Sequence, residues 1–111
     1  WGYTPLESIA FGIPTITTDL AGFGLWAKKH VTGSNISEGV AVVNRDDFNY
    51  FEVADAITSS ILTLAGKDKK EAAEIRKRSF SLAAKAEWSK FIVYYEEAFR
   101  IALESADKRN N

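Results

Sequence analysis

The sequence predicts an α/β fold that is mostly helical, with two short parallel strands among its 111 residues. Two strand-like segments, 13–18 and 39–44, lie in the first half, and long amphipathic helical patterns fill the second half. Two strands are too few for the sheet of a complete domain, so we expect further strands before Trp1. We therefore interpret the chain as the trailing part of a doubly wound α/β domain.

A helix-start signature occupies residues 1–7. Thr4 is predicted as the N-cap and Pro5 as the first helical residue, and Glu7 completes a T-x-x-E capping box. Gly2 allows the backbone to come close to a ligand in front of this helix, where free N–H groups and the positive dipole end suit a phosphate. The alternative from these residues alone is a capped helix with no ligand.

The next segments alternate between strand and helix signals. Ile16 and the neighbouring threonines favour a strand over 13–18. The apolar run 40–43 is typical of a strand buried on both faces, within a strand predicted over 39–44. Between the strands we expect a short helix over Leu25 to His30 and a surface loop over Thr32 to Asn35.

Two side chains in this region have competing interpretations. Phe23, between Gly22 and Gly24, is interpreted as a buried anchor rather than a ligand contact. His30 is the only histidine, so the sequence offers few partners for a catalytic diad or a histidine metal site. We assign His30 a structural or surface role.

Helices are predicted for the remainder. The first begins near Asp46-Asp47, and its apolar face consists of Phe51, Ala54, Ile57, Ile61 and Leu64. Gly66-Lys67-Asp68 interrupts the pattern, and a solvated, charged helix is predicted for 69–78.

The last helix, about 86–108, has two apolar stripes. One contains Trp88, Phe91, Ile92, Tyr95, Phe99, Ala102 and Leu103, and the other Tyr94, Ala98 and Ile101. A surface helix normally needs one stripe, so two indicate burial against further protein, or alternatively a dimer surface. We expect residues 109–111 to form a disordered tail.

The run from Trp1 to Gly24 resembles the C-terminal nucleotide-sugar site of the eukaryotic-type glycogen synthases. That family's pattern reads E-P-W-G-Y-T-P-x-E, then a short helix, then G-x-P-[ST]-x-T-T and G-F-G. Its fixed letters from W onward are met by Trp1, Gly2, Tyr3, Thr4, Pro5, Glu7, Gly12, Pro14, Thr15, Thr17, Thr18, Gly22, Phe23 and Gly24.

The resemblance implies a retaining glucosyltransferase of the GT-B type, which has two Rossmann-like domains. It would transfer glucose from UDP-glucose to the non-reducing end of an α-1,4-glucan without a cofactor or metal, in the cytoplasm. Residues 1–85 would be the trailing part of the C-terminal nucleotide-sugar-binding domain. Residues 86–108 would be the crossover helix that packs on the N-terminal domain.

The resemblance also implies roles for four residues. Glu7, the second Glu of an E-x7-E pair, would hold the donor ribose, while Gly2, Tyr3 and Thr4 would lie against the diphosphate. We expect Glu7 to cap the helix when no ligand is present. The Tyr3 role needs only its backbone N–H, so its side chain is either a ligand contact or a packed aromatic. The chain holds no catalytic residue, because the first Glu of the pair would lie two residues before Trp1.

The charged segment 69–78 and the last helix correspond to two further regions of this family. Eukaryotic members carry an arginine-rich helix that binds glucose-6-phosphate, but here only Arg76 and Arg78 are arginines, interleaved with acidic residues. We interpret this segment as a solvated basic face rather than a regulatory site. The last helix is similar to the family's W-R-Y-L-G-R-Y-Y region, without its arginines.

The composition of the chain limits the classes of partner that it is expected to bind. A net charge of -1 argues against nucleic acid, the chain lacks cysteine, and no apolar run is long enough to span a bilayer. The expected partners are a nucleotide sugar, an α-glucan acceptor, the N-terminal domain of the same longer chain and, as a further candidate, a second copy in a homo-oligomer. Only the family resemblance favours UDP over ADP as the nucleotide of the donor. The alternatives are another GT-B glycosyltransferase and a noncatalytic helical interaction module.

Overall fold

The computed structural model describes residues 1–32 and 35–111. The element order is α1 (Tyr3–Ala10), β1 (Thr15–Thr18), α2 (Gly22–Ala27), a 3-10 turn (Ile36–Glu38), β2 (Val40–Val43), α3 (Tyr50–Ala65), α4 (Lys69–Ala84) and α5 (Trp88–Asn110). The chain is thus mostly helical with two short strands, which confirms the predicted fold class. Gly33 and Ser34, in the loop predicted over Thr32 to Asn35, lie outside the described residues.

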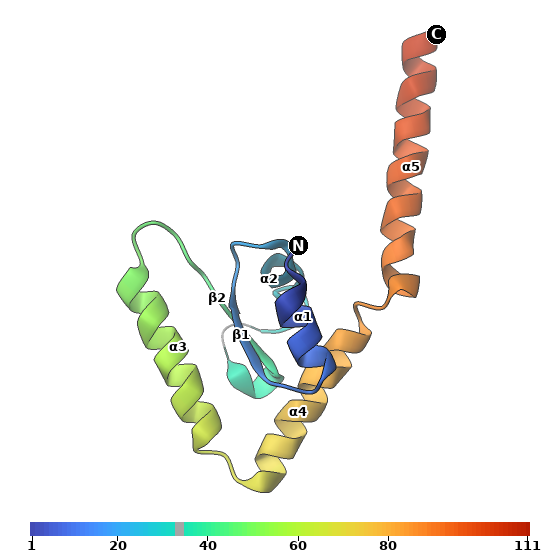
Figure 1. Cartoon of the computed structure of the whole chain (residues 1–111). Coiled ribbons are helices and arrows are strands. Elements are labelled where there is room, and N and C mark those ends of the chain that lie inside the picture. The colour runs from blue at the N-terminus through green and yellow to red at the C-terminus, as the bar shows by residue number, and fades with distance from the viewer. Residues whose placement is uncertain (33–34) are drawn as a thin grey trace.

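The two strands pair in parallel, as predicted. Thr15 lies opposite Val40 and Thr18 opposite Val43. All four residues of β2 are buried, which fits the continuous apolar run, whereas β1 is half-buried. The strands lie between α3 on one side and α1 and α4 on the other (Figure 1). β1 begins at Thr15 rather than at residue 13, because Pro14 lacks the N–H that a ladder hydrogen bond needs. β2 is one residue shorter than predicted at each end, and Gly39 before it has a φ of 94°.

The core lies where α1, α2 and β2 meet. Its buried members are Ile9, Phe23, Ala27, Val40, Val42 and Leu82. Phe23 is only 1% exposed, so its prediction as a buried anchor is confirmed. A Cβ on Gly24 would lie 1.9 Å from the carbonyl oxygen of Thr18, so only glycine lets α2 pack this closely on the end of β1.

Helix α3 begins at Tyr50, not at the predicted Asp46-Asp47. Asp46 instead forms a turn, in which its carboxylate accepts from the Phe48 N–H and its own N–H donates to Asn49 Oδ1. The predicted apolar face is also partly wrong, because Phe51 and Ile61 are exposed. Helix α3 contacts β2, and its buried or half-buried residues are Val53, Ala56, Ile57, Ser60 and Leu64.

Helix α4 begins where the charged helix was predicted and runs beyond it, to Ala84. Asp68 caps it by accepting from the Glu71 N–H at 2.8 Å. The helix is solvated on one side only, because Ile75, Ser79 and Leu82 are buried on the other. Ser79 Oγ donates to the Gly39 carbonyl at 2.8 Å and so joins α4 to the start of β2.

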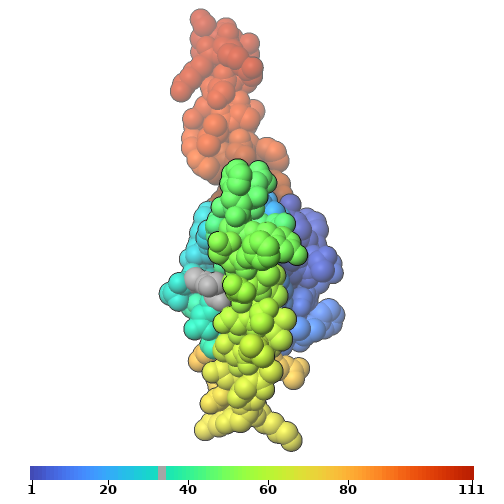
Figure 2. All heavy atoms as spheres, turned by 90° about the vertical axis from the view of Figure 1, so that its left-hand side faces the viewer, coloured from blue at the N-terminus to red at the C-terminus, as the bar shows by residue number. Residues whose placement is uncertain are grey.

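Helix α5 extends away from the rest of the molecule (Figures 1 and 2) and contains no buried residue. Both predicted aromatic stripes are therefore largely exposed, with Trp88 at 61% and Tyr94 at 70%. The helix continues through Asn110 and so includes part of the 109–111 segment that we expected to be disordered.

Candidate functional site

The N-terminus of α1 lies at the end of the sheet where the strands finish. Helix α1 runs opposite to β1, so the start of α1 lies near the segment that leaves β1 (Figure 1). The backbone confirms this contact, since the Phe23 N–H donates to the Trp1 carbonyl oxygen at 2.8 Å. In open α/β sheets, ligands bind outside the carboxyl ends of the strands. The four predicted site residues, all in α1 or just before it, are therefore at the edge where a ligand is expected.

The capping box predicted from Thr4 and Glu7 does not form. Gly2, not Thr4, is the N-cap, and no side chain caps the helix. The φ of 84° at Gly2 turns the chain sharply enough for the helix to begin at Tyr3, two residues before the predicted start. Thr4 then has helical backbone, whereas an N-cap residue needs an extended one.

This arrangement leaves the first turn of α1 suited to an anion. The N–H groups at a helix start carry partial positive charge, and no acidic side chain occupies the first turn. Gly2, Tyr3, Thr4 and Glu7 are all exposed. Tyr3 and Glu7 are four residues apart and so share one face of the helix. The Tyr3 side chain is 69% exposed, so it is not a packed aromatic within this chain.

Beside the helix start is a hollow of about 680 Å³ with largely aromatic walls. Its lining includes Trp1, Tyr3, Trp26, Lys29, His30, Trp88, Phe91, Tyr94 and Tyr95. His30 is at the surface and its ring lies 4.8 Å from that of Trp26. Burial, with the positive charges of Lys85 and Lys29, lowers the pKa of His30 from its ordinary value. A neutral imidazole against an indole is consistent with the surface or structural role expected for His30.

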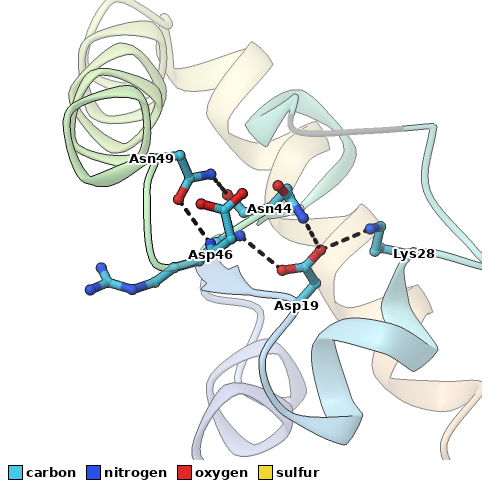
Figure 3. Close-up of polar contacts among 6 residues, drawn as sticks. Asp19, Lys28, Asn44, Asp46 and Asn49 are labelled. Atoms are coloured by element: carbon cyan, nitrogen blue, oxygen red, sulfur yellow. Dashed lines mark hydrogen bonds and ion pairs between the residues drawn. The ribbon is translucent and has the colours of Figure 1, made fainter.

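A polar cluster ties the carboxyl ends of both strands together, and Asp19 is its centre (Figure 3). Lys28 Nζ and Asn44 Nδ2 donate to Asp19 Oδ2 at 3.0 and 2.8 Å, and the Arg45 N–H donates to Oδ1 at 2.9 Å. The hydrogen bonds from Asn44, the Arg45 N–H and Lys28 hold the pKa of Asp19 well below its ordinary value. Asp19 is therefore a charged acceptor that joins β1, β2 and the end of α2.

Neither Asp19 nor Asn44 was predicted as a site residue from the sequence. The available signal was their position, since Asp19 directly follows β1 and Asn44 directly follows β2. Parallel strands end at the same edge of a sheet, so side chains that follow them come together. Hydrophobic periodicity gives no information about such residues.

The two arginines of α4 contact the chain's own backbone. Arg76 Nε donates to the Gly12 carbonyl at 3.2 Å, and the Arg78 guanidinium donates to the Ser37 carbonyl at 2.8 Å. Both contacts are near the starts of the strands, at the opposite end of the sheet from the start of α1. These arginines thus hold α4 to the loops that lead into β1 and β2.

Within 1–32 and 35–111, no group of three or more His, Cys, Asp or Glu side chains is placed to hold a metal ion. None of the helices in that part of the chain has the length and apolar character needed to cross a membrane.

Comparison with known proteins gives a consistent match along the chain. A sequence model of the glycogen synthase family matches residues 1–110. A glycogen [starch] synthase of Caenorhabditis elegans is 30% identical over 104 residues, which cover 94% of this chain and 15% of that protein. The Neurospora crassa enzyme and the human liver enzyme are each 28% identical over 106 residues, or 96% of this chain and 15% of theirs. The chain therefore spans about 15% of the length of these relatives.

Proposed function

Because the chain belongs to the glycogen synthase family, we propose that it is the C-terminal nucleotide-sugar-binding part of a retaining glucosyltransferase of the GT-B type. The complete protein transfers glucose from UDP-glucose to the non-reducing end of an α-1,4-glucan, in the cytoplasm. Its partners are the donor, the glucan acceptor and the N-terminal domain of the same protein. The observation that supports this proposal best is the uncapped, exposed start of α1 at the carboxyl edge of the sheet.

In this proposal the start of α1 binds the donor diphosphate. The backbone N–H groups of Tyr3 and Thr4 point out of the first turn, and Gly2 carries no side chain that would hold the phosphates away. As the bond to glucose breaks, negative charge grows on the departing diphosphate. A helix start that is already in place stabilises this charge without reorganisation. The donor is the only nucleotide species required, and no cofactor or metal takes part.

Glu7 holds the donor ribose. Its carboxylate is exposed, makes no cap to the helix and lies on the same face of α1 as Tyr3. An ionised carboxylate accepts hydrogen bonds from two neighbouring hydroxyl groups, which matches a ribose. We expected Glu7 to cap the helix without ligand and to bind the ribose with it. Because Glu7 does not cap the helix in this structure, its carboxylate has no cap to give up when the ribose binds.

The test measures UDP release from UDP-glucose and glycogen by the full-length protein that contains this chain. We expect glucan-dependent release by the wild type. Glu7→Ala should lower kcat/KM about 10- to 100-fold, the equivalent of losing one hydrogen bond to a charged group. Glu52→Ala is the matched control, because Glu52 is an exposed carboxylate on α3, away from the start of α1. A wild-type protein that releases no UDP with any glucan would overturn the proposal.

A further inference from the structure

We propose that Asp19 is a positioning residue for the donor site, because it fixes the segment on which the start of α1 rests. This inference depends on the proposed function, since it concerns the binding of UDP-glucose at α1. Asp19 itself does not touch the donor in this proposal. It acts through the backbone of residues 20–23 and through the ends of the two strands.

The first step is the contact between the start of α1 and the segment that follows Asp19. The Trp1 carbonyl accepts the Phe23 N–H at 2.8 Å. A Cβ placed on Gly2 would lie 3.8 Å from the Cβ of Ala21, and one on Gly22 would lie 3.2 Å from the Cα of Trp1. The backbone proposed to meet the diphosphate therefore packs directly on residues 21–23.

The second step is the anchoring of that segment at both of its ends. Before it, Asp19 accepts the Arg45 N–H and Asn44 Nδ2, which tie it to the residues after β2. After it, α2 ends in the turn that carries Lys28, whose Nζ returns to Asp19 Oδ2 at 3.0 Å. One carboxylate thus closes the segment 19–28 into a loop and fastens that loop to β2.

The third step is the electrostatic character of this anchor. The Asp19 side chain is only 10% exposed, whereas Lys28 is 47% exposed. A shielded carboxylate with three donors holds its partners more firmly than a surface ion pair does. The cluster extends further, because Asn49 Nδ2 donates to the Asn44 carbonyl at 2.9 Å (Figure 3). Hydrogen bonds therefore connect the strand ends to the turn before α3.

The experiment compares UDP-glucose kinetics of the full-length protein and three variants at saturating glycogen. Asp19→Ala removes both acceptor oxygens, so we expect KM for UDP-glucose to rise about tenfold while kcat changes less than threefold. Asp19→Asn keeps one acceptor oxygen, so its KM should fall between those of the wild type and Asp19→Ala. Asp55→Ala is the control, because Asp55 is an exposed carboxylate on α3, and its KM should equal the wild-type value.

The outcomes separate this inference from the proposed function. The split between KM and kcat distinguishes positioning from a general loss of folded protein, which would lower kcat without changing KM. An active wild type and an Asp19→Ala variant with unchanged KM would overturn the role of Asp19 alone. An inactive wild type would overturn the proposed function, and the role of Asp19 in donor binding with it.

Discussion

At the scale of single residues, Asp19 makes the stability of the chain depend on pH. Its pKa is lowered in the folded state, so protonating it costs more there than in the unfolded chain. Its stabilising contribution is complete above the unfolded pKa, near 4, and is lost as the pH falls below that value toward the folded pKa.

This dependence can be measured by urea unfolding, between pH 3 and pH 7, of the full-length protein that contains this chain. The wild type should be more stable than Asp19→Asn at pH 7 by about 1.5 to 3 kcal/mol, the range for hydrogen bonds to a charged group. The difference should shrink steadily below about pH 4. A difference that stays constant with pH would show that the carboxylate charge contributes nothing.

Sequence patterns predicted the burial or role of some side chains correctly and of others incorrectly. Phe23 was predicted as a buried anchor rather than a ligand contact, and the structure agrees. The T-x-x-E motif was misleading because Gly2 starts the helix early, and a local motif does not report the conformation of the residue before it. Asp19 was missed because its partners come from residues 28, 44 and 45, which only the fold brings together.

At the scale of elements, Gly39 controls how α4 packs on the start of β2. Its φ is 94°, and a Cβ there would lie 2.4 Å from the Ser79 backbone nitrogen. Gly39→Ala must therefore both strain the backbone and displace α4, so we expect a loss of at least about 2 kcal/mol. The loss is measured as the change in free energy of unfolding of the full-length protein that contains this chain.

Gly66→Ala is the matched control for this substitution. Gly66 ends α3 with a φ of -80°, and the atoms nearest to an added Cβ are 3.5 Å away or more. Alanine fits that conformation, so the variant should be as stable as the wild type or more stable, by up to about 1 kcal/mol. Equal losses in the two variants would contradict the role assigned to the Gly39 contact.

The positions of the helices and strands were easier to predict than which face of a helix is buried. The apolar run 40–43 and the Gly66-Lys67-Asp68 interruption gave β2 and the α3–α4 boundary, because both signals depend on neighbouring residues only. The buried face of α3 was assigned only partly correctly because the helix is apolar on two sides. Ser60 is buried while Ile61 is exposed, and periodicity cannot tell which side meets a sheet.

At the scale of the whole molecule, much apolar surface remains exposed. Helix α5 has no buried residue, although both of its predicted stripes are present, and α3 exposes Phe51, Ile61 and Leu62. Single apolar side chains at a surface are normal, but continuous stripes indicate contact with further protein. This agrees with a chain that spans only 15% of the length of its relatives.

Because the chain corresponds to only part of the proposed enzyme, we predict that the 111-residue chain alone does not transfer glucose. In the proposed enzyme the chain supplies the start of α1 and the ribose contact, while the catalytic Glu and the acceptor site belong to the rest of the protein. A helix start contributes only about 0.3 to 2 kcal/mol to the binding of an anion, which corresponds to very weak donor affinity. We expect no UDP release from the purified chain with UDP-glucose and glycogen, and at most small shifts of the residue 2–7 amide signals in NMR titration with UDP. Turnover by the isolated chain would contradict this division of the site between two parts of one protein, because it would require all the reacting groups to lie within these 111 residues.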